Sequence, residues 1–261
     1  MSRTIQGYGF RPSLPDHRDL IADASGIKVA REVDPRADMT PIYDQGQIGS
    51  CTGQAVAGAV DYHRIVGGQA PFYPARLAIY SCERIIEGQS LDADTGAYGR
   101  DGFKAATKYG LLREVDYPYS DQAPVWQDDP RDELAKAEMA GGDHFTRLHS
   151  PYKAVPRRLS SFKAVLSNHQ TIAFGFSVYQ SFETNEVAKT GIMPLPGPGE
   201  KIVGGHEVLA IGYLAREPNH VLVRNSWGTG WGMNGYLLMP WAVLLDASMS
   251  SDFRTIYRPA S

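Results

Sequence analysis

A cysteine in the first third of the chain stands where its thiol could act as a nucleophile. Cys51 ends the stretch 44–51 and comes directly before a run of small and apolar residues at helical spacing. The first N–H groups of a helix have no partner within the helix, and the helix dipole there favours negative charge. This position therefore favours the reactive thiolate. The alternative is that Cys51 is a buried structural cysteine.

The groups that such a cysteine needs occur elsewhere in the chain. His206 follows two glycines at the start of an apolar run, and Asn225 ends the next apolar run. A histidine can accept and return a proton, and an asparagine at a neighbouring strand end can orient the imidazole. Gln45 lies shortly before Cys51, across a glycine-containing turn, where its amide could donate to an oxyanion. We interpret these residues as a candidate site for attack on a carbonyl group.

Helices and strands must hold these residues in place, and the two occupy different parts of the chain. Periodicity predicts helices at 50–66, 74–86, 101–109 (with Asp101 as its cap), 132–140 and 160–167. Apolar runs predict strands at 172–179, 207–213, 220–225, 235–239 and 253–257. Helices that precede strands indicate an α+β chain rather than alternating βαβ units.

Composition excludes several classes of protein. The chain has 261 residues and a net charge of −3, which gives no sign of nucleic-acid or membrane binding. Two cysteines make a disulfide framework improbable, and His144 and His149 lack further ligands at metal spacing. The N-terminus lacks the apolar stretch of a signal peptide. We expect a monomer without cofactor or metal, either cytoplasmic or exported without a recognisable signal peptide.

The candidate residues also resemble a known family. The resemblance rests on Gln45-Gly46 before Gly49-Ser50-Cys51, on Gly205-His206, and on the block 225–232 that begins Asn225-Ser226-Trp227. These stretches are similar to the papain-like cysteine peptidases, in particular to the prokaryotic branch that includes xylellain. The resemblance covers roughly residues 41–261. It implies an α+β fold of two lobes, one helical and one an antiparallel β-barrel, with the active-site cleft between them.

The resemblance also implies a role for each residue. Cys51 is the nucleophile, His206 its acid and base, and Asn225 the group that orients the imidazole. Gln45 completes an oxyanion hole with the Cys51 N–H, and Trp227 covers the contact between Asn225 and His206. The leading hypothesis is a cysteine endopeptidase that cuts peptides or unfolded proteins through a thiolate–imidazolium pair and an acyl-enzyme. The alternatives are an acyl-transferring or amino-terminal-trimming relative on the same triad, and a catalytically inactive peptide-binding module.

The resemblance further suggests which residues contact an extended substrate, namely Gly96, Ala97, Tyr98, Gly205, Glu207 and Trp227. The chain departs from the family pattern at several positions. Ala97 replaces a glycine, Thr52 replaces an aromatic residue, and Glu207 stands where a small residue is common. A carboxylate at Glu207 would favour Arg or Lys in the adjoining pocket. The alternative is a solvated or salt-bridged Glu207.

Residues 1–40 form a separate, less regular part of the sequence. They contain several prolines and little helical periodicity, so we expect a short prosegment-like arm before a peptidase domain at 41–261. We expect the arm to occlude part of the cleft, with Phe10, Leu14 and Ile21 in apolar subsites. Arg11 or Arg18 would then approach Glu207. The alternative is an arm with a purely structural role.

Overall fold

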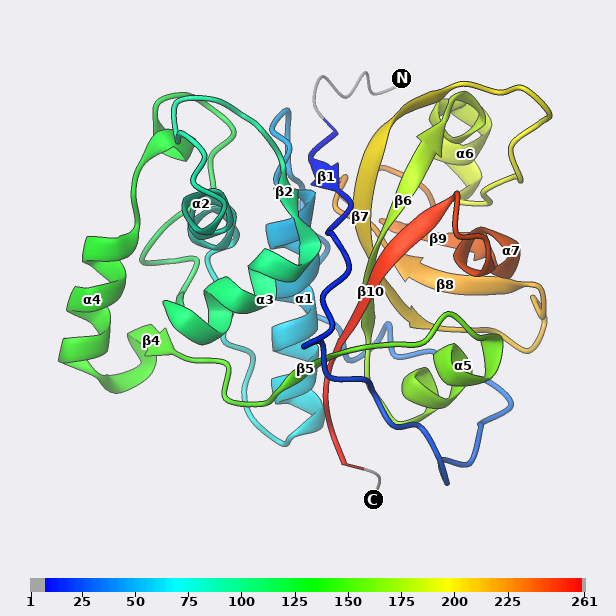
Figure 1. Cartoon of the computed structure of the whole chain (residues 1–261), viewed down its shortest axis with the longest axis horizontal. Helices are drawn as coiled ribbons and strands as arrows, with labels where there is room; N and C mark the ends of the chain where they lie inside the picture. The colour runs from blue at the N-terminus through cyan, green and yellow to red at the C-terminus, as the bar shows by residue number, and fades with distance from the viewer. Residues whose placement is uncertain (1–7, 260–261) are drawn as a thin grey trace.

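The structure is a computed structural model that describes residues 8–259. Figure 1 shows a helical lobe and a sheet lobe side by side, with helix α1 (Cys51–Val66) between them. Helix α1 packs against strand β7 (Ile202–Gly212) of the sheet lobe. Small residues make this packing close, since Gly58 of α1 lies directly against the Leu209 side chain. The helix that carries Cys51 is thus buried between the two lobes.

The helical lobe contains three further helices and two pairs of short strands, one of which includes a strand from the arm. The helices are α2 (Arg76–Ile86), α3 (Gly99–Lys108) and α4 (Arg131–Ala140). The strands are β3 (Leu111–Leu112) with β4 (Phe145–Thr146), and β2 (Ala97–Tyr98) with β1 (Phe10–Arg11). Two 3-10 turns, Val125–Gln127 and Gly142–His144, lie in the connections.

The sheet lobe is built on six antiparallel strands in the order β5-β10-β6-β7-β8-β9. Besides β7, they are β5 (Tyr152–Ala154), β10 (Ser250–Ile256), β6 (Ile172–Tyr179), β8 (His220–Arg224) and β9 (Tyr236–Pro240). The lobe also holds α5 (Leu159–Ser167), the 3-10 turn Gln180–Glu183, α6 (Asn185–Thr190) and α7 (Trp241–Leu245).

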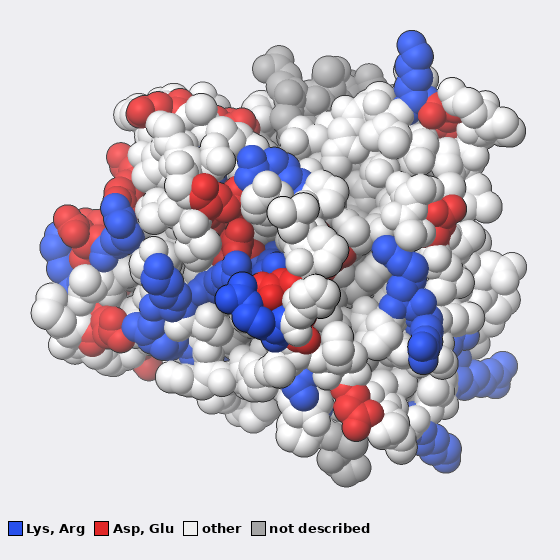
Figure 2. Space-filling view, in the orientation of Figure 1, with Lys and Arg blue, Asp and Glu red and all other residues white. Residues whose placement is uncertain are grey.

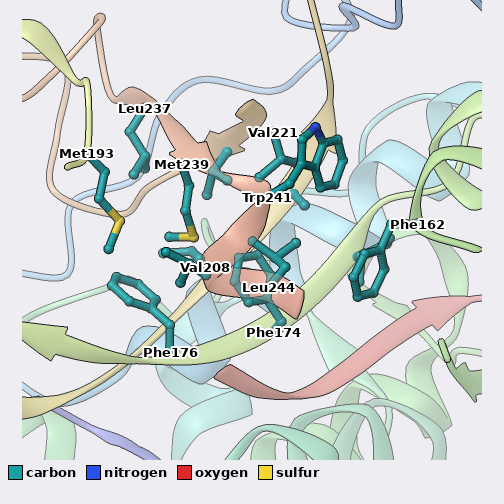
Figure 3. Close-up of a cluster of buried hydrophobic side chains, with 14 of the residues drawn as sticks. Phe162, Phe174, Phe176, Met193, Val208, Val221, Leu237, Met239, Trp241 and Leu244 are labelled. Atoms are coloured by element: carbon teal, nitrogen blue, oxygen red, sulfur yellow. The ribbon is translucent and has the colours of Figure 1, made fainter. Parts of the chain in front are cut away.

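The core of the sheet lobe consists of aromatic and branched side chains from several strands and from α5 and α7 (Figure 3). The rings of Phe162 and Phe253 lie 4.7 Å apart, and Phe174 stacks on Phe253 at 5.4 Å. Such aromatic pairs add specific geometry to the burial of apolar area. This packing fixes the sheet that carries His206.

Strand register decides where His206 points. In the pairing of β6 with β7, His206 lies opposite Phe176. The pairing of β7 with β8 begins further along, at Leu209 opposite Arg224. The first half of β7, which includes His206, therefore has no paired β8 beside it. The N-terminus of α1 lies there instead and brings Cys51 close to His206.

The α+β expectation is confirmed, with the helices before the main strands along the chain. The five predicted helices and five predicted strands all occur. Strand β7 begins at Ile202, earlier than predicted, so His206 lies within the strand rather than before it. Asp101 does not cap α3, because the helix begins at Gly99 and Asp101 pairs with Lys104 within its first turn.

The N-terminal arm follows the seam between the lobes. In Figure 1 the blue chain passes along this seam from β1 towards β5. Phe10 is buried as predicted, but Leu14 and Ile21 are 80% and 58% exposed, so the expectation that they fill subsites is wrong. The basic residues also differ from the prediction. Arg11 pairs with Glu87 and Arg18 pairs with Asp16.

The arm then joins the body of the protein. The N–H of Ala22 donates to the carbonyl of Ala154, and Val33 and Tyr213 exchange two backbone hydrogen bonds. The Arg224 guanidinium donates to the carbonyls of Thr40 and Pro41. Residues from about 13 onward therefore pack as part of the folded domain.

Candidate active site

Cys51 is the first residue of α1, as predicted, and its side chain is fully buried. Ser50 precedes the helix but does not cap it through its side chain. Its hydroxyl instead bonds the Tyr119 hydroxyl at 2.6 Å and accepts from the Gln54 amide. These contacts hold the turn that presents Cys51.

His206 and Asn225 lie together beneath a tryptophan. The Nε2 atom of His206 lies 2.8 Å from the Asn225 Oδ1, inside the protein. The Trp227 ring stacks on the imidazole with centroids 4.8 Å apart and an interplanar angle of 23°. Because water is excluded, this hydrogen bond holds the ring orientation more firmly than an exposed one would. The Asn225 Oδ1 also accepts from the Ser226 N–H, which fixes the amide in turn.

Gln45 lies within the same buried layer, with only 1% of its surface exposed. Its Oε1 accepts from the Ser226 hydroxyl at 2.7 Å, and its Nε2 donates to the Ile48 carbonyl at 3.1 Å. Its backbone carbonyl accepts from the Tyr119 hydroxyl. The amide is therefore held on both sides, close to the turn that leads into Cys51.

The state of the thiol differs from the expectation of a thiolate. Burial raises the pKa of Cys51 to about 12, although hydrogen bonds from the backbone of Glu207 and Gly9 act in the opposite direction. Loss of hydration disfavours the charged form and is the largest cause of this raised pKa. Enclosure by both lobes and the arm therefore favours the neutral thiol.

The arm lies directly over the thiol. Gly9 contacts Gly49 so closely that a Cβ on Gly9 would overlap the Gly49 carbonyl, so only glycine fits there. The Gly9 carbonyl accepts from the Ala97 N–H at 2.7 Å, and β1 continues parallel to β2. On the other side of Gly9, the Tyr8 hydroxyl bonds Glu183.

The predicted substrate-contacting residues divide into two groups, and the arm occupies one of them. Ala97 and Tyr98 form β2, which pairs with β1, so the alanine at 97 does not prevent a backbone hydrogen bond there. Gly96, just before β2, contacts the Gly9 carbonyl. Gly205 lines a cavity of about 290 Å³ together with Phe10.

Glu207 and Trp227 lie elsewhere. Trp227 covers His206, with 5% of its surface exposed. Glu207 is 2% exposed, and its carboxylate packs against Gly99 at the start of α3 rather than lining the cavity beside Gly205. The reason is strand alternation, which sends neighbouring side chains to opposite faces. The Glu207 carboxylate is therefore buried on the face of β7 opposite to His206.

Some residues at the site were not anticipated from the sequence. Ser226 and Tyr119 both hold Gln45, and neither belongs to a spacing pattern that reveals this contact. Gly9 was not anticipated either, since its close contact with Gly49 arises only from the fold. Within residues 8–259, no cluster of three His, Cys, Asp or Glu side chains is arranged to hold a metal ion.

The fold and site together define a two-lobed cysteine peptidase, and comparison with known proteins agrees. The sequence model of the papain family of cysteine proteases matches residues 29–249. An uncharacterised peptidase C1-like protein of Acanthamoeba polyphaga mimivirus is 33% identical over 97% of this chain and 87% of that protein. Papain of Carica papaya is 26% identical over 76% of this chain and 51% of that protein.

Solved structures give the same result. Xylellain, a cysteine protease from Xylella fastidiosa, superposes with a TM-score of 0.83 at 33% identity, covering 97% of each chain. Procathepsin L 3 from the larval midgut of Tenebrio molitor shares the fold, with a TM-score of 0.71 at 20% identity over 96% of this chain and 75% of that one. The chain belongs to the papain family of cysteine peptidases, in the prokaryotic xylellain-like branch, and is a hydrolase of peptide bonds.

Proposed function

We propose that this peptidase is an endopeptidase in which Cys51, His206, Asn225 and Gln45 perform the reaction. The observation that carries the assignment is the buried bond of 2.8 Å between His206 and Asn225, covered by Trp227, on the strand that packs against the Cys51 helix. Since Nε2 of His206 bonds Asn225, Nδ1 is the nitrogen that exchanges a proton with the thiol.

The reaction follows from this arrangement. The Cys51 sulfur, having given its proton to His206, attacks the substrate carbonyl, and the oxyanion accepts hydrogen bonds from the Cys51 N–H and the Gln45 amide. His206 returns the proton to the leaving amine as the C–N bond breaks, which leaves a thioester. Water then attacks the thioester with His206 as base, releasing the acid and restoring the thiol.

The path of the arm supports cutting within a chain rather than only at its ends. Tyr8 lies on one side of the thiol and Phe10 on the other, so this cleft accepts polypeptide in both directions from Cys51. Enzymes that trim amino termini need the cleft closed on one side. All four polar groups are present, which argues against the inactive module. No observation favours the acyl-transferring relative.

We also propose that residues 8–12 act as an inhibitory plug, a name used below for these residues alone. The Gly9 carbonyl is held by Ala97, while its N–H faces the thiol, so this peptide presents no carbonyl to Cys51. The plug can therefore lie at the nucleophile without being cut. The arm is intramolecular, so it competes with substrate at an effective concentration of order mM.

Two substitutions test both parts of the proposal. Gly9→Val places side-chain atoms where the Gly49 carbonyl lies, so it should displace the plug and raise turnover of a small peptide. Lys28→Val, at an exposed position of the same arm, should leave turnover unchanged. Cys51→Ala in the Gly9→Val background should abolish cleavage of a peptide library. Equal turnover in Gly9→Val and wild type would refute the plug, and activity in Cys51→Ala would refute the nucleophile.

The proposed environment is a reducing compartment, the cytoplasm or a site reached by export without a recognisable signal peptide. Cys51 and Cys82 are both free thiols, and both are buried. In the described residues, no helix has the length and apolarity needed to cross a membrane.

A further inference from the structure

Two departures from the family pattern meet behind the nucleophile. Thr52, directly after Cys51, donates its hydroxyl proton to the Glu83 carboxylate on α2. Glu207, directly after His206, extends from β7 into the same layer between the lobes, and its backbone hydrogen-bonds the Cys51 thiol. Both glutamates are buried, with exposures of 0% and 2%.

Helix α3 is shaped to receive these two side chains. Gly99 and Gly102 lie one turn apart on it, and a Cβ at either position would overlap a carboxylate, that of Glu207 at Gly99 and that of Glu83 at Gly102. One oxygen of each carboxyl group, Oε2 of Glu207 and Oε1 of Glu83, has no hydrogen-bond partner within residues 8–259. A buried carboxylate without a partner is costly, so a carboxyl group in this position tends to keep its proton.

The surroundings reinforce this tendency. Burial raises the pKa of both carboxyl groups well above the usual range, and the charge of Glu207 raises that of Glu83 further. The other titratable or charged groups that face the pair are Cys51 on α1, Glu87 on α2, Asp101 on α3, and Asp252 and Arg254 on β10. Arg254 is the one cation in this set, and it already pairs with Asp19 and Asp252.

We propose that Glu83 and Glu207 form a proton-holding pair behind Cys51, so that the reactivity of the thiol depends on whether the pair is charged. This inference rests on the proposed role of Cys51 as nucleophile. While the pair holds its protons, neither carboxyl group places a negative charge beside the thiol. Once the pair ionises, its negative charge lies beside the thiol and disfavours the thiolate. Both glutamates act through Cys51 and are positioning residues.

The test is the pH dependence of Cys51 alkylation by iodoacetamide in the full-length Gly9→Val chain, in which the displaced plug leaves the thiol accessible, with the labelled site located by mass spectrometry. The variants are Glu207→Gln, Glu83→Gln, which keeps an acceptor for Thr52, and the exposed control Glu133→Gln on α4. Every variant carries Gly9→Val, and so does the reference that stands as wild type in each ratio, so the effect of the arm on access cancels. Melting temperatures show which variants are folded, and either glutamine variant suffices for the test.

We expect a variant-to-wild-type ratio near one at about pH 5, rising to roughly tenfold by about pH 9, which corresponds to about one pKa unit at the thiol. The control ratio should stay at one throughout. Ratios of one at every pH for the folded glutamine variants, with Cys51 still labelled, would overturn the pair. Absence of selective Cys51 labelling at any pH in Gly9→Val, in which the plug is displaced, would overturn the proposed nucleophile instead.

Discussion

Asp19 offers the sharpest test of how the arm is attached. Its Oδ2 accepts from the Arg100 guanidinium of α3 at 2.8 Å and from the Arg254 guanidinium of β10 at 2.7 Å. One carboxylate of the arm thus ties the helical lobe to the sheet lobe. Figure 2 shows acidic and basic side chains gathered near the centre of this face, where the arm crosses the seam. We expect Asp19→Asn to destabilise the whole protein.

The expected loss of stability depends on the carboxylate partners that Arg100 and Arg254 keep after the substitution. Removing one partner of a buried ion pair costs about 3–5 kcal/mol. Arg100 and Arg254 are 8% and 4% exposed, but each keeps a second carboxylate, Asp16 at 3.7 Å and Asp252 at 3.9 Å. Asp19 is itself 18% exposed. We therefore expect a loss of about 2 kcal/mol, which for a chain of this size lowers the melting temperature by roughly 4–8 °C.

The assay is thermal unfolding followed by circular dichroism, with Asp23→Asn as the control. Asp23 lies on the same arm, is exposed, and accepts a hydrogen bond from the N–H of Ser25, two residues along the chain. It should leave the melting temperature unchanged. An Asp19→Asn variant that melts with wild type would show that this part of the arm does not support the fold. A truncation to residues 38–261 removes the same carboxylate and should be destabilised for the same reason.

Three further outcomes are expected. In the Gly9→Val background, Asn225→Ala should lower kcat by about 5- to 160-fold with little change in KM, since a hydrogen bond worth about 1–3 kcal/mol orients the base. An equally large rise in KM would contradict an orienting role. Ser226→Ala frees the Gln45 amide and should lower kcat by roughly 2- to 10-fold, measured on the same peptide. The raised pKa of Glu207 stabilises the fold below the unfolded value of 4.5, and this contribution is lost as pH rises towards the folded pKa. The melting temperature of wild type should therefore fall more steeply above about pH 4.5 than that of Glu207→Gln, and parallel curves would exclude this linkage.

The sequence predicted the chemistry better than the path of the arm. Cys51, His206 and their partners were identifiable because the reaction permits few residue types, and because each lies at the end of a regular apolar pattern. The cleft position of Gly9 depends on pairing between β1 and β2, which are far apart in sequence and only two residues long. No local pattern encodes such a contact.

Glu207 illustrates a second limit of sequence reasoning. Alternation along a strand predicts that its side chain points away from that of His206, but not what it meets there. The answer depends on Gly99, a residue of the other lobe whose missing Cβ makes room for the carboxylate. Asp19 is similar, because its role depends on two arginines that only the folded chain brings together.

The attachment of the arm behind the plug has a consequence for control of the enzyme over time. Because Asp19 stays bound to both lobes and Ala22 to the strand β5, release of residues 8–12 would be a first-order event that dilution does not favour. If residues 8–12 act as the proposed plug, an intact enzyme that has opened would close again as fast as the tether allows. A cut in the exposed stretch around Leu14 and Arg18 would make the opening permanent. The proposed plug would thus give one molecule a reversible closed state and, after a single peptide bond is cut, an irreversible open one.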